Sequence, residues 1–455
     1  MAPVFTAIAL AVLLVSSSAA AGNSDEVNAG VDVTLTGGAV VANVSTGASL
    51  WYNPAGLARS ASASFELTGV TFKVSTVKAP GLLTLETGEQ SSSKRVDISL
   101  VPEALTFTVP LKKVKLGIGL FNSSLRRELV QEQVFHPGDP TGDPTATPPT
   151  PSADWIAGAN TRIDHFHLST GVAGSFDKRK QKALVGGAFD IVVSTARIDR
   201  LLSGLYAGGP AGIVSATELS NTAGLGVQLK GGVQWMPIPK LRLGFSLSTP
   251  SYLVMLADRL SASESLTPPG ASPVDPSGAN TQSRKVSGGW FGSEPGTMRL
   301  GIAYVGNWGW IEGDLVVDFK LRSSKFLFNQ TTAPNGRIGA VFNVHQFVKL
   351  GLGAFTDFSQ TEQLLVLGDR QIDFFGANFG VLFTNKDTSP DAPETSADDD
   401  KLVIAFAIGI RYSHGRGDIL GLLLPPTYNP DAIQTRPVDT KVNDVDINFG
   451  VKVLF

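Results

Sequence analysis

The 455-residue chain contains no cysteine. This absence excludes disulfide bonds, thiolate metal sites and a lipid anchor on a terminal cysteine. Charged residues are scarce at 17%, and the formal net charge is only −3. Because nucleic-acid binding needs a strongly basic surface, we expect no nucleic-acid partner.

Long hydrophobic runs are missing beyond the N-terminus. After residue 21 no apolar stretch approaches the ~20 residues that a transmembrane helix needs. The one early run, Val4–Val15, is shorter than this and precedes the small residues Ser16–Ala21. We therefore predict a signal peptide over residues 1–21, with cleavage after Ala21, in preference to a membrane anchor. Its weak point is that no Lys or Arg precedes the apolar run.

Catalytic and metal-binding motifs are also absent. The sequence has no G-x-S-x-G, P-loop or H-E-x-x-H pattern. His165 and His167 share one face of a predicted strand without a third ligand, so we interpret them as polar interior residues. The run Asp398–Asp400 lacks the ligand spacing of a calcium loop and suits a solvated turn. We expect no enzymatic activity, no cofactor and no bound metal.

What recurs instead is alternation of apolar and polar residues in segments of about ten residues. At the C-terminus one parity is apolar, comprising Val445, Ile447, Phe449, Val451, Val453 and Phe455. The other parity holds Asp446, Asn448, Gly450 and Lys452. Successive side chains of a strand point to opposite faces, so this segment has one apolar and one polar face. In an exported chain, the pattern predicts a transmembrane β-barrel with lipid outside and a polar lumen.

Counting such segments predicts an all-β fold with fourteen antiparallel strands. Their approximate ranges are 63–76, 95–109, 113–131, 161–176, 183–199, 223–236, 240–259, 294–306, 309–327, 335–344, 347–359, 370–384, 402–414 and 444–455. Short connections alternate with long stretches, which we predict to be external loops, at 133–160, 200–222, 260–285 and 415–443. Connection 385–401 belongs by this alternation to the periplasmic side, where it is unusually long for a turn. Because lipid cannot satisfy an open sheet edge, the strand near Phe65 must pair with the strand near Phe449.

Residues 22–62 form a region of a different kind. They are rich in Gly and Ala and alternate only in patches, which is poor material for a solvated tail. A wide barrel leaks unless it is filled, so we predict that this region folds as a hatch inside a barrel of residues 63–455. Within it, Pro54 biases Asn53 toward an extended conformation, and Ala55 allows close approach. We predict that Asn53 bonds its own backbone or the barrel wall, and that Asn53, Pro54 and Ala55 gate the lumen.

The Asn53-Pro54-Ala55 segment, placed just before the first strand of an exported barrel, resembles that of the FadL/OmpP1/TodX family. The stretch Trp235–Pro250 is similar to this family too. The resemblance covers the whole chain, and it implies a fourteen-stranded barrel in the bacterial outer membrane, plugged by a hatch. It further implies passive uptake of hydrophobic molecules such as long-chain fatty acids. We also expect contact with outer-membrane lipid, a monomeric state, and recognition of Phe455 by the barrel-insertion machinery.

In this family a kink in the third strand opens a side exit to the membrane. Here the apolar alternation of strand 113–131 is interrupted at Phe121, Asn122, Ser123 and Ser124, which are our candidates for that kink. The same residues equally suit a strand end at the membrane rim.

Two apolar stretches are candidates for a substrate-binding surface, since each buried CH₂ gains roughly 0.8 kcal/mol. Their residues are Leu201, Leu202, Leu205, Tyr206, Leu253 and Leu256, with Arg200 and Arg259 near enough in sequence to meet a ligand carboxylate. These residues also suit the loop-side ends of strands. Glu312, Asp314 and Asp318 share one strand face, and we expect them to pair with Arg or Lys on neighbouring strands.

Two other functions stay open at this point. A general diffusion porin would lack a plug and show a large conductance. A non-transport barrel would act as an assembly or secretion scaffold and hold a stable protein partner. The sequence does not identify the ligand.

Overall fold

The computed structural model describes residues 28–60, 62–137, 152–176, 182–207, 212–267, 280–286, 291–323, 328–364, 367–385, 402–426 and 432–455. The predicted signal peptide, the Asp398–Asp400 run and most of connection 385–401 lie outside these residues.

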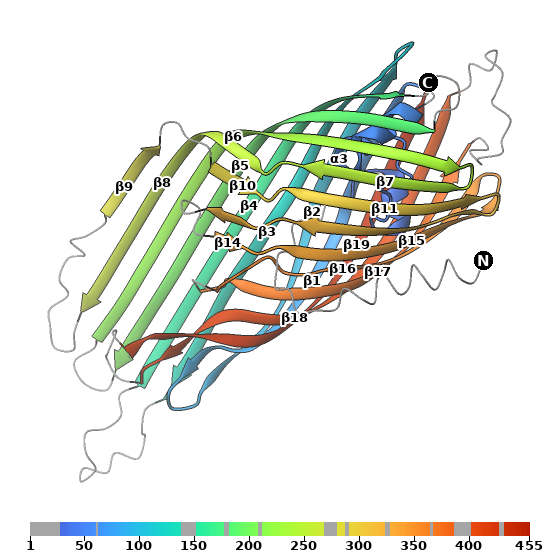
Figure 1. Cartoon of the computed structure of the whole chain (residues 1–455). Coiled ribbons are helices and arrows are strands. Elements are labelled where there is room, and N and C mark those ends of the chain that lie inside the picture. The colour runs from blue at the N-terminus through green and yellow to red at the C-terminus, as the bar shows by residue number, and fades with distance from the viewer. Residues whose placement is uncertain are drawn as a thin grey trace, which may run out of the picture.

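In the described part of the chain, seventeen strands form one sheet that closes on itself, because β1 pairs with both β2 and β19 (Figure 1). They are β1 (Ser64–Leu85), β2 (Gln90–Pro110), β3 (Lys115–His136), β4 (Ser152–Ser175), β5 (Ala183–Ala207), β6 (Gly212–Ile238), β7 (Leu241–Ser248), β8 (Ser251–Thr267), β9 (Asn280–Val286), β10 (Phe291–Glu294), β11 (Thr297–Gly306), β12 (Gly309–Asp318), β15 (Ala333–His345), β16 (Val348–Asp357), β17 (Arg370–Thr384), β18 (Val403–Leu424) and β19 (Gln434–Leu454). The short strands β13 (Leu321–Ser323) and β14 (Phe328–Gln330) pair only with each other. The predicted all-β closed barrel is confirmed.

The predicted closure of the barrel is also confirmed. Phe65 lies opposite Val453, and Gly69 lies opposite Phe449. Along β19, Asp444, Asp446 and Asn448 are buried inside while Val445 on the other parity is exposed. The terminal strand therefore has the two faces that its sequence predicted.

The predicted loop 200–222 is wrong, because strand structure continues almost throughout it. β5 runs to Ala207 and β6 begins at Gly212, and Arg200 lies opposite Glu218 across the two strands. Loops 133–160, 260–285 and 415–443 are likewise partly strand.

The wall is interrupted where the sequence predicted continuous strands 240–259 and 294–306. β6 pairs with β7 and then with β8, and the break between them contains Pro250. Proline has no N–H for the sheet ladder, which accounts for a break at this position. The strand that follows in the wall is interrupted as well. Its parts pair separately, since β11 pairs with β7, while β9 and β10 pair with β8.

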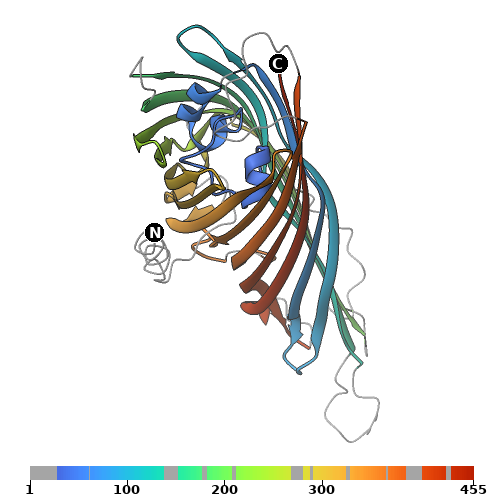
Figure 2. The same cartoon turned by 90° about the vertical axis from the view of Figure 1, so that its right-hand side faces the viewer.

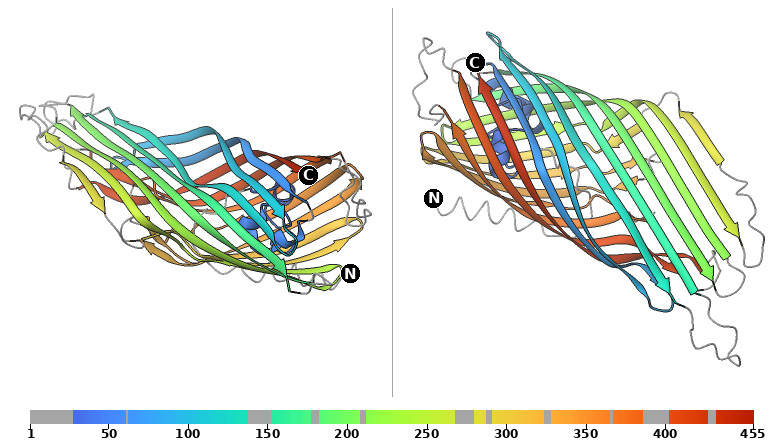
Figure 3. Two further views of the ribbon diagram at one scale, coloured as in Figure 1. Left: turned by 90° about the horizontal axis from the view of Figure 1, so that it is seen from above. Right: turned by 180° about the vertical axis from the view of Figure 1, so that it is seen from behind.

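The barrel has two unlike ends. One end carries short turns such as 239–240 and 307–308, together with the start of β1 and the end of β19; we call it the short-turn end. The strands β3 to β6 are long, from 22 to 27 residues each, and run side by side toward the opposite, far end (Figure 3).

Residues 28–60, here called the N-terminal segment, lie inside the barrel (Figure 2). They contain helices α2 (Val31–Thr36) and α3 (Ser49–Tyr52) and the 3₁₀ helix η1 (Pro54–Arg59). α2 lies against β15 to β19, and η1 lies against β3 to β6. In the described part of the chain, no helix is long and apolar enough to cross a membrane.

Candidate functional site where the N-terminal segment meets the wall

Inward-facing carboxylates hold the N-terminal segment by its backbone. Asp314 Oδ2 accepts hydrogen bonds from the N–H groups of Val40 (2.7 Å) and Val41 (3.1 Å), and Glu312 Oε1 accepts one from Ala42 (2.5 Å). We expected Glu312, Asp314 and Asp318 to pair with Arg or Lys on neighbouring strands, and Arg337 does lie directly opposite Asp314. Glu312 and Asp314 accept their hydrogen bonds from the segment, whereas Asp318 accepts one from Thr297. The physical reason is that an irregular buried backbone needs acceptors for its N–H groups.

Asn53 connects the segment to itself and to the wall. Its side chain is fully buried and its backbone is extended, with φ at −160°. Nδ2 donates to the carbonyl of Val41 (2.9 Å) and to that of Val233 in β6 (3.1 Å), while Oδ1 accepts from the N–H of Ala55 (3.2 Å). The expected conformation and both kinds of hydrogen bond are present. A gating role for Asn53, Pro54 and Ala55 stays a prediction.

Glycines in the wall let the segment approach this closely. A Cβ added at Gly232 would lie 2.1 Å from Asn53 Oδ1, and one added at Gly186 would lie 2.4 Å from the carbonyl oxygen of Pro54. No side chain fits at either distance, so part of the chain's high glycine content is explained by the packing of residues 53–55.

Trp51 lies on a group of four buried ionisable side chains, which we call the charged cluster: His167, Asp190, Lys230 and Glu294. Lys230 Nζ is 4.1 Å from the centre of the Trp51 ring and 2.7 Å from Asp190 Oδ2. His167 lies between the two acids, with Nδ1 3.2 Å from Asp190 Oδ2 and Nε2 3.0 Å from Glu294 Oε2. The cluster thus joins wall strands β4, β5, β6 and β10 beneath one aromatic ring of the segment.

Neighbouring hydroxyls complete the hydrogen bonding of the cluster. Ser169 donates to Asp190 (2.5 Å), and Ser251 (2.6 Å) and Ser123 (2.9 Å) donate to Glu294. Buried charges destabilise a fold unless they are paired and hydrogen-bonded. Removing one member of the cluster would leave the charge of its partner buried without a pair, which destabilises the folded state. The cluster therefore forms a paired, buried polar surface against which Trp51 of the segment packs.

Ser123, His167 and Asp190 lie in the hydrogen-bond order of a hydrolase triad, which the sequence did not suggest. Ser123 Oγ, however, donates to Glu294 at 2.9 Å and is 3.4 Å from His167 Nε2. The adjoining cavity has a volume of about 30 Å³, room for about one water molecule and none for a substrate. The geometry supports a structural role for the serine. Among the described residues, no group of three or more His, Asp or Glu side chains is arranged to hold a metal ion.

Two of the predicted kink residues belong to this site. The Phe121 ring is fully buried with its centre 5.4 Å from that of Trp51, and Ser123 reaches the charged cluster. Asn122 lies on the opposite parity and is half-buried, and the side chain of Ser124 is outside the described part. The register of β3 on β4 shifts between Ser124 and Arg126.

Pairing between β2 and β3 stops at this point. Its last pair is Ala104 with Phe121, although β3 stays paired with β4 as far as His136. Among the strand residues that the structure describes, 90–103 of β2 and 122–136 of β3 have no pairing with each other; we call this stretch the β2–β3 gap. At the far end the two strands meet again, where His136 Nδ1 lies 2.6 Å from Glu89 Oε1 in the β1–β2 turn.

The residues proposed for substrate binding do not form one surface. Leu202 and Tyr206 point inward and pack with a buried apolar cluster that includes Leu83, Leu85, Trp155 and Leu424. Leu201 and Leu205 alternate with them and are exposed on the outer face. Because this stretch is a strand and not the predicted loop, successive side chains point to opposite faces, and the two pairs of residues lie on different sides of the wall.

The other proposed substrate contacts are dispersed. Leu253 and Leu256 are buried on β8, away from that cluster. Arg200 Nη1 donates to Glu218 at 2.8 Å, so it already has a carboxylate partner. The side chain of Arg259 lies outside the described part.

Sequence reasoning missed Trp51 and the charged cluster. A usable signal existed, since Asp190, Lys230 and His167 are charged or ionisable residues on the polar parity of predicted strands. Nothing in the sequence brought Glu294 to them, because that contact depends on the register of β8 and β10.

No protein-family model matches the sequence, and no curated protein sequence matches it. Solved structures do. A FadL homologue of Pseudomonas aeruginosa superposes with a TM-score of 0.59 at 12% identity, over 95% of this chain and 99% of that one. The Ralstonia pickettii toluene transporter TbuX gives 0.54 at 13% identity over 95% and 99%, and the P. putida toluene transporter TodX gives 0.52 at 14% over 94% and 99%. The closed all-β barrel implied by the family resemblance is therefore confirmed, while the number of fourteen strands and the hatch stay predictions.

Proposed function

We propose that this chain is a bacterial outer-membrane channel for the passive uptake of hydrophobic molecules. The observation that carries the proposal is the contact between Trp51 and Phe121. It joins the N-terminal segment, which lies inside the barrel, to the point where β2 and β3 stop pairing. An occupied lumen next to an unpaired stretch of wall suits a molecule that leaves sideways into lipid rather than through a water-filled pore.

We count the wall as fourteen strand positions. β7 with β8 forms one interrupted position, because both pair with β6. β9, β10 and β11 form the next, because they pair in turn with β8 and β7. In this account residues 1–21 are the signal peptide, 22–62 the hatch and 63–455 the barrel.

The transport path follows from this arrangement. A hydrophobe enters at the far end, where the inward side chains around Trp155 and Tyr206 are apolar. These side chains are buried against one another, so entry requires them to separate and rebury their apolar surface against the molecule. Movement of the hatch around Asn53, Pro54 and Ala55 then admits it to the β2–β3 gap at Phe121 to Ser124. No energy source is needed, since the membrane interior is the more favourable environment for the molecule.

The substrate class is that of hydrophobic small molecules, with long-chain fatty acids and aromatic hydrocarbons both included. Two of the solved structures with this fold are toluene transporters, and another is described as a monoaromatic hydrocarbon channel. These names support a hydrophobic cargo for the present chain without separating the two kinds of molecule.

The porin alternative is disfavoured by specific contacts, and the scaffold alternative is left to experiment. In a general diffusion porin the lumen is open, whereas here Asp314, Glu312 and Asn53 bind the segment inside the barrel. A scaffold would depend on a protein partner, which a pull-down from outer membranes would reveal.

The proposal is tested by purifying the full chain from outer membranes and analysing its organic extract by mass spectrometry. We expect a co-purifying apolar molecule in stoichiometric amount and a small single-channel conductance. A large, steady conductance without such a molecule would instead identify a porin.

A further inference from the structure

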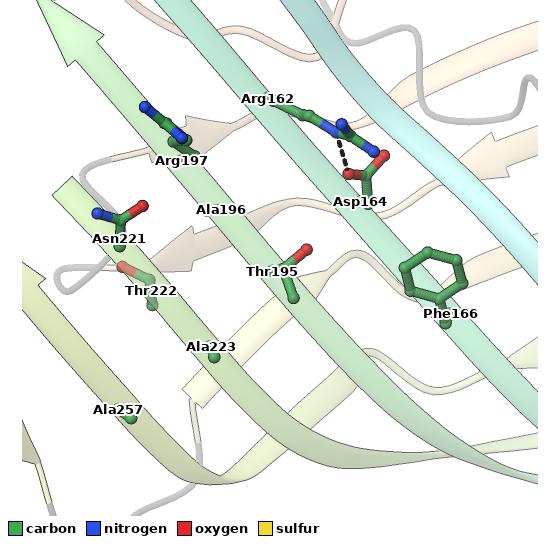
Figure 4. A pocket seen from close by; sticks show the side chains of 10 residues that line it. All are labelled: Arg162, Asp164, Phe166, Thr195, Ala196, Arg197, Asn221, Thr222, Ala223 and Ala257. Carbon is green, nitrogen blue, oxygen red and sulfur yellow. Dashed lines mark hydrogen bonds and ion pairs between the residues drawn. The ribbon is translucent and has the colours of Figure 1, made fainter. Parts of the chain in front are cut away.

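The outer face of the barrel carries a concavity of about 500 Å³ across β4, β5, β6 and β8 (Figure 4). Strand parity shows that it faces outward: Phe166, Thr195, Arg197, Ala223 and Ala257, which line it, are exposed, while His167 and Val192 on the alternate parity are buried. It is therefore separate from the hatch and the charged cluster.

The concavity lies at the height where the outer face changes from apolar to polar. On β5 the outward residues Phe189, Ile191 and Val193 are apolar and exposed, and the next ones toward the far end are Thr195 and Arg197. On β4 the outward residues change in the same way, from Leu168 and Phe166 to Asp164 and Arg162. The apolar outward stretch of β5 from Val185 to Val193 has about the length that the hydrocarbon layer requires. The concavity therefore meets lipid head groups.

Two arginines stand beside each other at this height. Arg162 and Arg197 are directly opposite in the β4–β5 register, an arrangement that is unfavourable for like charges. Each is balanced by one acid, with Arg162 Nε 2.5 Å from Asp164 and Arg197 Nε 2.9 Å from Asp199. Both guanidinium groups bind these acids through Nε, and both side chains are more than half exposed. The terminal nitrogens are not used in these bonds and have the fork geometry that phosphate binds.

A second concavity, of about 200 Å³, continues toward the far end. Gln131, Asn160 and Asp199 are among its lining residues. The amides of Gln131 and Asn160 can donate to and accept from sugar hydroxyls, and the Asp199 carboxylate can accept from them. Apolar surface on one side, paired arginines in the middle and amides beyond match the order of acyl chain, phosphate and sugar in a membrane glycolipid.

We propose that Arg162 and Arg197 bind a phosphate of a phosphorylated glycolipid in the outer leaflet. Its acyl chains lie against Phe166 and Val193, and its sugars extend toward Asn160 and Gln131. The proposal rests on the outer-membrane location proposed above, but it is independent of transport through the barrel.

The test uses the purified full chain in detergent, with bisphosphorylated lipid A as the probe and native mass spectrometry as the readout. We expect the wild-type protein to retain the lipid and to bind the dephosphorylated form at least roughly tenfold more weakly, since charge-assisted bonds to phosphate are lost. The double variant Arg162→Gln/Arg197→Gln should lose affinity by a similar factor, and Arg162→Lys/Arg197→Lys should retain part of it.

Arg416→Gln is the matched control. Arg416 is also exposed on the outer face, and it pairs with Asp439 at 3.4 Å, but it lines neither concavity. Equal losses in the control and in the double variant would show nonspecific attraction and overturn the proposal, as would unchanged binding in a folded double variant. Hydrophobe uptake should be unaffected by the double variant, so a failure here is distinguishable from a failure of the proposed transport function.

Discussion

Lys230 holds its ammonium nitrogen 4.1 Å from the centre of the Trp51 ring, within the range of an attractive cation–π contact. Lys230 belongs to β6 and Trp51 to the N-terminal segment, so this contact joins the barrel wall to the segment inside it. Asp190 fixes the lysine at 2.7 Å, and Phe121 of β3 lies against the other partner. One aromatic ring therefore connects the N-terminal segment to the strand that borders the β2–β3 gap.

Replacing Trp51 should loosen the hatch. Trp51→Ala removes a buried aromatic side chain, a loss that typically costs about 3–5 kcal/mol, and it uncovers the charged cluster. We expect faster leakage of small sugars into liposomes containing the variant, with a smaller effect for Trp51→Phe. Trp308→Ala is the control, since Trp308 is exposed in a turn at the short-turn end. Equal leakage for Trp51→Ala and the control would contradict the role given to this contact.

A methyl group added to the inner face of β6 should displace the N-terminal segment, whereas one added to the outer face should not. Gly232→Ala places a Cβ 2.1 Å from Asn53 Oδ1, whereas a Cβ at the adjacent Gly231 meets nothing within 4 Å. Gly232→Ala should therefore speed hydrogen exchange of residues 49–59 by at least roughly tenfold, the factor expected from losing about one to two hydrogen bonds. Gly231→Ala should exchange like the wild-type protein. If the two variants behave alike, Asn53 is not anchored at this wall.

The β2–β3 gap should be sensitive to β-propensity. Asn122→Val with Ser124→Val supplies β-branched residues that favour continued strand pairing past the Ala104–Phe121 pair. We expect uptake of hydrophobic molecules to fall several-fold while the barrel keeps its heat-modifiable mobility on gels. Unchanged uptake in a folded variant would remove these residues from the exit path.

The contact that closes the gap at the far end should persist in acid. Hydrogen bonds from the Thr87 hydroxyl and the His136 ring lower the pKa of Glu89 from 4.5 to about 2. A carboxyl whose pKa is lowered by folding stabilises the folded state above its ordinary pKa, and this contribution disappears as the pH falls through the lowered value. Titration of the Glu89 carboxyl carbon by NMR should give a midpoint near 2 in the wild-type protein. A midpoint near 4.5 would show that the turn is not held by these bonds.

Much of the barrel could be predicted from the sequence, because a strand with one apolar and one polar face has apolar and polar residues in alternation. The closure of the Phe65 strand onto the Phe449 strand followed from the requirement that no edge remain unpaired. The far ends of the strands could not be predicted this way. Near Arg200 apolar residues fall on both faces of β5, such as Leu201 outward and Leu202 inward, so the alternation is lost and the strand looked like a loop.

The site was less accessible to sequence reasoning. Asn53 stood out because Asn53-Pro54-Ala55 resembles a segment of a known family, and its extended conformation follows from the proline after it. The charged cluster depends on contacts between residues as far apart as His167 and Glu294, which only the strand order determines. Glu312 and Asp314 were placed on the correct face, but the identity of their partners depended on the fold of the N-terminal segment.

The central claim is that the chain conducts hydrophobic molecules through a plugged barrel. It is tested most directly by expressing the chain in cells that lack a hydrophobe channel, and by measuring uptake of labelled oleate, labelled toluene and a small sugar. The account predicts a several-fold rise in uptake of at least one of the two hydrophobes, with sugar permeability unchanged. A rise in sugar permeability without any rise in hydrophobe uptake would contradict it.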